Sequence, residues 1–440
     1  MPAFSSDVRP DRRPICRWCS WRHAHAMALL LALLPAYTLA SSAGGATPWP
    51  GFRGPGGDGV ATDRNLPVEW SESQGVAWKT AIPGKAWASP VIWDRLVWLA
   101  NATEDGRRLS AVGVDRDSGR VVHDVTVFEI AEPQFCHPFN SHASCTPVIE
   151  GDRLYVHYGS AGTACLDTGS GRILWSRQDL PCDHFRGPGS SPILHGDLLI
   201  VALDGFDLQY VVALDKATGR TVWRKDRDID YGTDDGDAKK AYPTATVIRD
   251  GDREQVVIPS AGATIAYVPA TGEELWRVKH GGMNASARPL FAHGMVYIDT
   301  AAGGMKFLAV RPDGTGDVTG THIAWKSSQG TGSRTSPLML GDRLFLVGNA
   351  GTASVLDALT GRSLWQKRLG GEFSASPLLA DGRIYACNQG GETFVLSASD
   401  PYDVLATNTL DAGCMASPAV FDGAIYLRTK THLYRLGSRP

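Results

Sequence analysis

The sequence has no marked excess of either charge. Its 440 residues carry a formal net charge of -3, with neither a basic surplus nor an acidic tail, which argues against nucleic acid as a partner. It also lacks a nucleophile elbow, a phosphate-cradling glycine loop and a dinucleotide fingerprint, so the enzyme classes built on these motifs are not indicated. A hydrophobic content of 43% is enough for a substantial core.

Long apolar runs are absent after the first 40 residues. Within them, five arginines precede the apolar stretch 26–34, which is short for a membrane span, and a small-residue site ends at Ala40. This pattern predicts a signal peptide over residues 1–40, cleaved near Ala40. We therefore expect a periplasmic or secreted protein without a membrane span. The pair Arg12-Arg13 is a weak sign of twin-arginine export, and Met27 is a second candidate start. The export route and the start codon are therefore left open.

One sequence unit then recurs eight times, at intervals of 40 to 57 residues. Each copy begins near a proline, turns at a Gly-Asp type pair and often ends in Asp-x-x-Thr-Gly-x-x-x-Trp. The prolines are Pro90, Pro147, Pro192, Pro243, Pro289, Pro337, Pro377 and Pro418. In the second copy, residues 147–149, 154–158, 164–167 and 172–175 read as four short strands. A repeat of this length and strand content predicts a propeller.

The predicted fold is all-β: an eight-bladed β-propeller of four-stranded antiparallel blades over residues 71–440, after a lead-in segment over residues 41–70. The last copy, 418–436, supplies only three strands, and Val76 to Lys79 are predicted to supply the fourth and close the ring. Tryptophans four residues after the turn glycine are expected to pack between blades. They are Trp175, Trp223, Trp276 and Trp365, with Trp325 in the fifth copy and His123 in that place in the first.

The fullest copy, Ala213 to Trp223, resembles the tryptophan-docking repeat of the PQQ-like (pyrroloquinoline-quinone-like) propellers. That superfamily includes quinoprotein dehydrogenases and outer-membrane-assembly propellers, and the likeness covers about residues 70–436. The lead-in Trp49-Pro50-Gly51-Phe52-Arg53-Gly54-Pro55 is similar to the opening of secreted bacterial members. The resemblance is highly specific for the fold and poorly specific for activity, because one fold hosts many functions.

The resemblance implies a way to recognise the enzymes: an adjacent Cys-Cys pair beside the quinone, and Cys-x-x-Cys-His in haem-bearing relatives. No two cysteines here are adjacent, and Cys16-x-x-Cys19 is followed by Ser20. We therefore expect a non-catalytic binding scaffold. The alternative is a quinone-dependent oxidoreductase of alcohols or sugars with a divergent site, whose cofactor would be PQQ with calcium. A hydrolase or lyase built on His184, Asp207 and an arginine is a third hypothesis.

The long connections are predicted to lie on one face of the ring, where function concentrates. The candidate ligand-binding residues on that face are His184, Arg186, Asp207, Asn284, Arg288, Arg334 and Lys430. Four of them, Arg186, Asn284, Arg288 and Arg334, precede innermost strands and are expected at the channel mouth. Arginines suit a protein or a small anionic or sugar-like ligand through paired hydrogen bonds; otherwise they bond loop carbonyls and aspartates. We expect a monomer.

Six cysteines remain after the predicted leader. The candidate disulfides are Cys136–Cys145, within one loop, and Cys387–Cys414, across neighbouring blades. His137 and His142 lie between the first two cysteines, so zinc is an alternative there, although the spacing is not a standard one. Residues 226–242 hold many aspartates, and a solvated loop balanced by Lys239 and Lys240 is favoured over a calcium site.

Overall fold

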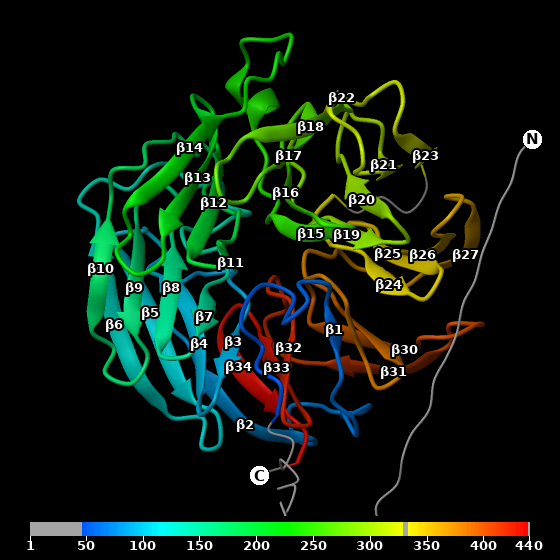
Figure 1. Cartoon of the computed structure of the whole chain (residues 1–440). Helices are drawn as coiled ribbons and strands as arrows, with labels where there is room; N and C mark the ends of the chain where they lie inside the picture. The colour runs from blue at the N-terminus through cyan, green and yellow to red at the C-terminus, as the bar shows by residue number, and fades with distance from the viewer. Residues whose placement is uncertain (1–45, 329–332, 439–440) are drawn as a thin grey trace, which may run out of the picture. The chain divides into compact units, whose positions relative to one another are not determined.

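The propeller follows from strands that are too short and too apolar to fold alone. In the computed structural model, which describes residues 46–328 and 333–438, eight sheets each contain four antiparallel strands (Figure 1). The middle strands of each blade are buried almost throughout, whereas the outer strands alternate or are exposed. Each blade must therefore cover its apolar faces with its two neighbours, which is what a closed ring provides.

The first four blades run from the innermost to the outermost strand in chain order. Blade 1 is β3 (Val91–Trp93), β4 (Leu96–Ala102), β5 (Arg108–Asp115) and β6 (Val121–Glu129); blade 2 is β7 (Val148–Glu150), β8 (Arg153–His157), β9 (Thr163–Asp167) and β10 (Ile173–Arg177); blade 3 is β11 (Ile193–His195), β12 (Leu198–Asp204), β13 (Gln209–Asp215) and β14 (Thr221–Asp226); blade 4 is β15 (Thr246–Asp250), β16 (Arg253–Pro259), β17 (Ala263–Tyr267) and β18 (Glu274–Lys279). A short 3-10 helix, η1 (Gly236–Lys239), precedes blade 4.

The other four blades follow the same order with two additions. Blade 5 is β19 (Leu290–Ala292), β20 (Met295–Asp299), β21 (Phe307–Val310) and β23 (Ile323–Ser327); blade 6 is β24 (Leu338–Leu340), β25 (Arg343–Val347), β26 (Thr352–Asp357) and β27 (Ser363–Arg368); blade 7 is β28 (Leu378–Ala380), β29 (Arg383–Cys387), β30 (Glu392–Ser397) and β31 (Val404–Thr409); blade 8 is β32 (Ala419–Phe421), β33 (Ala424–Arg428), β34 (His432–Leu436) and β2 (Val76–Ala81). The short strands β22 (Gly316–Asp317) and β1 (Val60–Ala61) add in parallel to β18 and β28.

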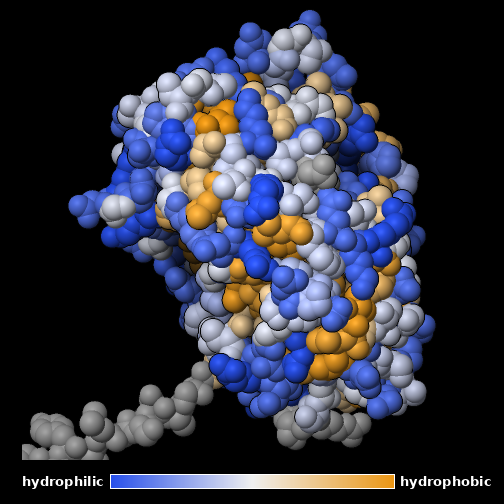
Figure 2. Space-filling model, turned by 90° about the vertical axis from the view of Figure 1, so that its right-hand side faces the viewer, coloured by the Kyte–Doolittle hydropathy of each residue, from blue (hydrophilic) through white to orange (hydrophobic). Residues whose placement is uncertain are grey.

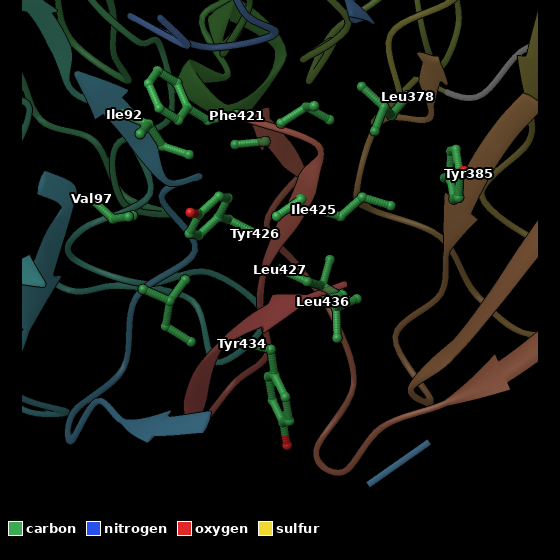
Figure 3. Packing of buried hydrophobic residues seen from close by; sticks show 14 of the residues in the cluster. Ile92, Val97, Leu378, Tyr385, Phe421, Ile425, Tyr426, Leu427, Tyr434 and Leu436 are labelled. Carbon is green, nitrogen blue, oxygen red and sulfur yellow. The ribbon is translucent and has the colours of Figure 1, made fainter. Parts of the chain in front are cut away.

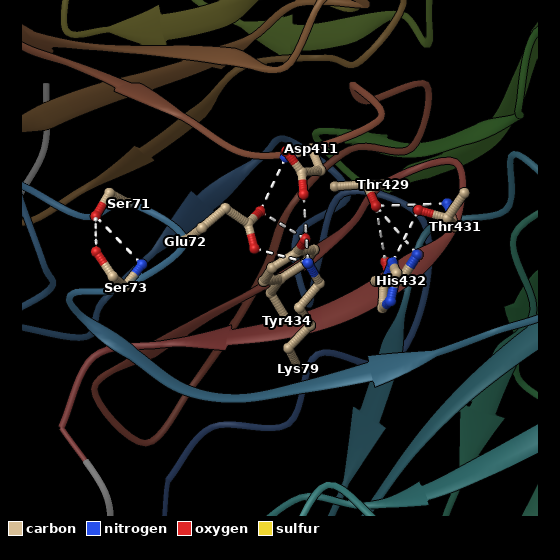
Figure 4. Close-up of polar contacts among 9 residues, drawn as sticks. All are labelled: Ser71, Glu72, Ser73, Lys79, Asp411, Thr429, Thr431, His432 and Tyr434. Atoms are coloured by element: carbon tan, nitrogen blue, oxygen red, sulfur yellow. Dashed lines mark hydrogen bonds and ion pairs between the residues drawn. The ribbon is translucent and has the colours of Figure 1, made fainter.

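The N-terminal strand β2 completes blade 8, as the sequence predicts. It pairs with β34, with Lys79 opposite Tyr434, so a segment near the start of the propeller holds its last strands. Beside this junction, the Glu72 carboxylate accepts hydrogen bonds from Lys79 (2.7 Å) and the Tyr434 hydroxyl (2.8 Å), as Figure 4 shows. Burial favours a raised pKa for Glu72, but the bonds from Lys79, the Asp411 N–H and Tyr434 outweigh it and lower the pKa.

The core at the closure is continuous across three blades. Figure 3 shows Ile92 and Val97 of blade 1, Leu378 and Tyr385 of blade 7, and the apolar side chains of β32 to β34 between them. Six further clusters of buried apolar residues lie around the ring. On the side of blades 5 to 7, apolar patches are separated by hydrophilic side chains (Figure 2), and the exposed Leu359, Leu364 and Leu405 lie on blades 6 and 7.

The repeated tryptophans pack between blades, as predicted. The Trp175 indole N–H donates to the Lys216 carbonyl of the next blade (3.0 Å), and its ring lies against Gly219, where a Cβ would come within 2.6 Å. Trp78 of β2 does the same at the closure, with its N–H bonded to the Arg116 carbonyl (2.8 Å). In blade 1, His123 instead stacks on Trp98 within its own blade, with 5.3 Å between ring centroids.

One expectation about the repeat is wrong: the predicted start of the fourth copy, Pro243, lies two residues before the position equivalent to the other repeat prolines. Pro243 does not open the innermost strand of blade 4, because Thr244 occupies the place that Ser191 has in blade 3. Thr244 accepts the Ser191 N–H, and β15 begins two residues after Thr244, just as β11 begins two residues after Ser191. Ala245 therefore stands where the other seven repeats have proline, and Pro243 belongs to the preceding connection.

Candidate functional site

A belt of hydroxyl side chains encircles the channel just before the innermost strands. Its members are Ser89, Thr146, Ser191, Thr244, Ser336, Ser376 and Ser417, with Arg288 in the eighth place. Each hydroxyl oxygen accepts the backbone N–H of the member in the preceding blade at 2.9 to 3.1 Å, and the Ser417 N–H donates to Ser89 to close the series. The belt satisfies backbone donors that the strands leave unpaired.

A pocket of about 420 Å³ lies on the axis of the propeller above this belt. All eight connections that lead into an innermost strand contribute to its wall. The lining includes the aromatic residues Trp87, Phe139 and Tyr242 and the belt residues Ser89, Thr146, Ser191, Thr244 and Ser417. This volume lies within the range of small-molecule sites, and the mixture of aromatic walls with a few polar groups is typical of them.

The lead-in segment crosses the channel and supplies Phe52 to the lining of the pocket. It is fastened by paired backbone bonds between Trp49 and Ile92 and by the Arg53 side chain, which is 2% exposed. The Arg53 guanidinium donates to the carbonyls of Pro337 (2.5 Å) and Pro377 (3.2 Å) and also bonds the Asp58 carbonyl. Burial lowers the pKa of Arg53 to about 9, with Asp58 acting in the opposite direction.

Three of the four predicted channel-mouth residues line the pocket: Arg186, Asn284 and Arg334. Arg288 lies apart from them, because its guanidinium donates to the Phe52 carbonyl (2.7 Å) and to the Thr246 hydroxyl (3.2 Å) beside the lead-in. Burial lowers the pKa of Arg288 to about 10, against the opposing charge of Asp58. Arg288 thus holds the lead-in segment in the channel.

The two arginines of the pocket have different electrostatic surroundings. Arg186 makes a paired contact with Asp237, at 2.6 and 2.5 Å, and this bond raises its pKa. The Arg334 guanidinium lies 4.3 Å from the centre of the Phe139 ring, a cation–π contact. Among the residues that the structure describes, no carboxylate pairs with Arg334. Arg186 is therefore neutralised locally, whereas Arg334 keeps its charge available at the pocket.

The other three candidate ligand-binding residues lie away from this pocket. His184 is buried, and its Nε2 accepts the Ser160 N–H (2.9 Å) while burial lowers its pKa to about 3. Asp207 accepts the backbone N–H groups of Asp183 and Leu208, both at 2.7 Å, so it orders its own loop. Lys430 is exposed and donates to the Gln389 carbonyl (3.2 Å). His184 and Asp207 do not bond each other.

The six cysteines in the described part of the chain are thiols. The Cys136 sulfur contacts the carbonyls of His137 and Arg186, whereas Cys145 is fully buried and interacts with the Gly159 backbone. Cys387 and Cys414 are both buried, and their thiols interact with each other across blades 7 and 8. Across residues 46–328 and 333–438, no group of three or more histidine, cysteine or acidic side chains is arranged to hold a metal.

The aspartate-rich connection before blade 4 is largely exposed, as predicted, but Lys240 departs from that prediction. Lys240 is completely buried rather than exposed, with its ammonium 5.1 Å from the centre of the Tyr242 ring, and burial lowers its pKa. Arg227 is also buried and pairs with Asp204 at 2.8 Å. The prediction for Lys240 was wrong because composition shows that a loop is polar but not which side chains the blades cover.

Several pocket residues were not singled out from the sequence. The belt could have been recognised, because Ser or Thr directly precedes the repeat proline in six of the eight copies. Trp87, Phe139 and Tyr242 carry no such signal, since each stands alone in a connection of different length. Phe52 belongs to the lead-in, and only the folded structure brings it to the axis.

Fold and pocket together place the chain in the class of PQQ-like repeat propellers. More narrowly, it belongs to the family described as outer membrane protein assembly factor BamB, whose model matches residues 51–178, 132–223 and 207–436. Together these ranges run from residue 51 to residue 436 and include every strand of the eight blades.

Curated relatives come from both branches of this class. The chain is 29% identical over 220 residues to methanol dehydrogenase [cytochrome c] subunit 1 of Methylobacterium organophilum, covering 44% of this chain and 30% of that protein. It is 25% identical over 210 residues to BamB of Legionella pneumophila, covering 48% and 51%, and 31% identical over 108 residues to BamB of Burkholderia pseudomallei, covering 24% and 28%. The matches thus span about half or less of each relative.

Solved structures share the fold at low sequence identity. BamB from Moraxella catarrhalis superposes with a TM-score of 0.56 at 13% identity, covering 82% of this chain and 98% of that one. The quinohemoprotein alcohol dehydrogenase of Comamonas testosteroni superposes with a TM-score of 0.61 at 12% identity, covering 89% and 81%. At these identities the likeness concerns the propeller architecture alone.

Proposed function

We propose that this chain is an exported, non-catalytic binding propeller that holds a protein segment or a small anionic or sugar-like ligand in its axial pocket. The observation that carries the proposal is the convergence of all eight blade connections on one pocket of about 420 Å³. A scaffold that surrounds one site from every side positions side chains rigidly, which reduces the entropy lost on binding. The membership in the BamB family also supports a scaffold role.

The pocket supplies surfaces for holding a ligand rather than a visible proton-transfer pair. The only histidine in its lining is His137, whose Nδ1 accepts the Phe139 N–H at 3.1 Å. The lining contains no aspartate or glutamate, and general acid–base catalysis most often uses histidine or a carboxylate. Export rests on the predicted signal peptide, which lies outside the described residues. No helix in the described part of the chain is long and apolar enough to cross a membrane.

A ligand screen against two matched variants tests the proposal. Purified full-length chain is heated with a panel of carboxylates, oligosaccharides and peptides, and the shift in melting temperature is measured. We expect a binder whose shift is lost in Trp87→Ala, which opens the pocket wall, and kept in Phe135→Ala, an exposed aromatic outside the pocket. The proposal fails if no member of the panel binds, or if every binder is unaffected by Trp87→Ala.

A quinone-dependent oxidoreductase is the second candidate, and the match to methanol dehydrogenase subunit 1 favours it. The aromatic and hydroxyl lining suits a planar quinone, but calcium prefers carboxylate oxygens, and the lining has none. The pocket therefore does not fit the calcium-bound cofactor. Reconstitution with PQQ and calcium, followed by a dye-linked assay over alcohols and sugars, decides this: turnover would replace the scaffold proposal, and its absence is expected.

A further inference from the structure

A second pocket, with a volume of about 250 Å³, lies between blades 1 and 2. Its wall comes from the loops between the two middle strands of these neighbouring blades and from the connections that follow their outermost strands, β6 and β10 (Figure 1). The linings of this pocket and of the axial pocket have only Pro188 in common. The pocket between blades 1 and 2 is therefore a separate site with its own set of side chains.

The charge of this pocket is opposite to that of the axial pocket. Among the described residues, its lining holds one carboxylate, Glu132, and no lysine or arginine, whereas the axial lining holds two arginines and no carboxylate. Arg107 donates to the Ala131 carbonyl (2.6 Å), beside Glu132, but its charge is paired with Asp105 at 3.7 Å. Within the described part of the chain, Glu132 forms no ion pair. Its negative charge is therefore left for a cation to neutralise.

The two histidines of the lining add no positive charge. Burial lowers the pKa of His142, and the charge of Lys85 lowers it further; burial lowers the pKa of His184 to about 3. The His184 Nε2 already accepts the Ser160 N–H at 2.9 Å, whereas the His142 ring makes no hydrogen bond within the described residues. A neutral imidazole has one nitrogen that accepts, so His142 offers an acceptor to a ligand.

The acceptors of this pocket are held in place by their neighbours. A Cβ at Gly106, whose φ is +72°, would come within 2.6 Å of the His142 ring, so this turn packs directly against the imidazole. The Gln178 side-chain N–H donates to the Ala161 carbonyl at 3.0 Å, which leaves the side-chain oxygen of Gln178 for a ligand. With Glu132, the lining offers three acceptor groups, and an ammonium group has three N–H donors.

The rest of the wall is mainly apolar. It includes Leu109, Ile130, Pro133, Ala161 and Pro188. Apolar surface of this kind favours a ligand with a hydrocarbon body. The pocket is also smaller than most sites for drug-sized molecules, so the body must be small.

We propose that the pocket between blades 1 and 2 binds a small organic ammonium ion, with its cationic head against Glu132 and His142 and its hydrocarbon body on the apolar wall. Three features carry this inference: the unpaired carboxylate, the acceptors without competing donors, and the separation from the axial pocket. It goes beyond the proposed function, because it assigns a second site that prefers the opposite charge.

Calorimetric titration of the full-length chain with phenethylamine and with phenethyl alcohol tests the inference at pH 7. The two compounds have nearly the same shape, but only the amine carries a positive charge. The amine is expected to bind about 10-fold or more tightly, because its bonds to the carboxylate are charge-assisted. Equal affinities of the two compounds, or no binding of the amine, would overturn the inference.

Matched carboxylate variants show whether the preference comes from the pocket. Glu132→Gln and Glu129→Gln remove the same charge from nearby exposed positions, but only Glu132 lines the pocket. Glu132→Gln should remove most of the preference for the amine, and Glu129→Gln should keep it. Equal loss in both variants would mean that the general negative field attracts the amine, and would overturn the site.

A substitution of the imidazole tests the second contact. His142→Phe keeps a flat ring against Gly106 and removes the acceptor nitrogen, so it should weaken amine binding by roughly 3- to 10-fold, the size of one hydrogen bond. Circular dichroism of each variant checks that the fold is intact. Amine affinity that is unchanged in His142→Phe would overturn the assignment of the cationic head to His142.

The same titration separates this site from the axial pocket. Amine binding that is lost in Trp87→Ala and kept in Glu132→Gln would place the amine in the axial pocket and overturn the inference. The proposed function is judged by other ligands, through their dependence on Trp87. Either proposal can therefore fail while the other holds.

Discussion

Single residues in this propeller act through backbone conformation and burial. Glycine at the last turn of a blade is needed for two reasons: the backbone there is left-handed, and the docking tryptophan leaves no room for a Cβ. The two effects can be measured separately. Gly219 has a φ of +73° and lies under Trp175, where a Cβ would come within 2.6 Å of the ring. Gly196, in a tight turn of the same blade, has a φ of +54°, and a Cβ added there would meet no atom within 4 Å.

Gly196→Ala is expected to lower the free energy of unfolding by about 1 kcal/mol, the cost of left-handed backbone for a residue with a Cβ. Gly219→Ala should cost about 1 to 3 kcal/mol more, because the tryptophan must also move. Urea unfolding monitored by circular dichroism measures both variants. Equal losses would contradict the inference that the glycine makes room for the tryptophan.

Buried neutral histidines predict a loss of stability in mild acid. Burial lowers the pKa of His157 and His184 to about 3 and that of His280 to about 4, from an ordinary value of 6.5. Between these values the unfolded chain binds more protons than the native one, so stability falls as the pH drops from 6.5 toward 4. Each histidine contributes up to about 1.4 kcal/mol per pH unit.

Urea unfolding at pH 7, 6 and 5 measures how steeply the free energy of unfolding changes with pH. In His157→Gln the slope should fall by roughly the share of one histidine, although the variant also loses a 2.8 Å bond to Thr163 and is less stable at every pH. An unchanged slope in His157→Gln would show that this histidine is not buried in its neutral form.

Between elements, the two cysteines at blades 7 and 8 are placed for a covalent link. Cys387 ends β29 and Cys414 precedes β32, and the Cys414 N–H donates to the Asn388 carbonyl at 3.1 Å. With the thiols also in contact, oxidation of the two thiols by an added disulfide such as oxidised glutathione is expected to join them. The link should stabilise the fold by about 3.5 kcal/mol, the value for a loop of this length.

Intact-mass and peptide mapping under oxidising and reducing conditions check this bond, with Cys387→Ser as the control. The same map tests the predicted Cys136–Cys145 bond, whose two sulfurs contact different groups in the folded chain. A melting temperature that is the same in oxidised and reduced protein would contradict the expected stabilisation by Cys387–Cys414.

For the whole molecule, the closure through β2 should be as strong as any other blade junction. Trp78 and Trp175 form a matched pair: each bonds a carbonyl of the next blade and covers its turn glycine, but only Trp78 closes the ring. Replacement of either by alanine should cost a similar amount, about 2 to 4 kcal/mol, in one cooperative transition. An early separate transition in Trp78→Ala alone would identify the closure as a weak point.

The sequence determined the architecture because its information is repeated. Strand alternation, turn glycines and docking tryptophans recur along the chain, so an irregular copy is corrected by its neighbours; even blade 4, which lacks the proline, keeps Thr244 in register. The closing strand could be predicted by counting strands, because the last copy of the repeat supplies only three of the four that a blade needs. The same repetition conveys little about function, because the repeats build the frame that all members share.

The site depended on the tertiary structure because it is built where the repeat breaks. Arg186 and Arg334 could both be identified as candidates from the sequence. Only the fold shows that Asp237 neutralises Arg186 and that Arg334 lies over the Phe139 ring. Arg288 follows the same rule as the others in sequence, yet it is taken up by the lead-in segment. Pairing, burial and convergence on an axis are relations between distant residues, and the sequence specifies them only through the completed ring.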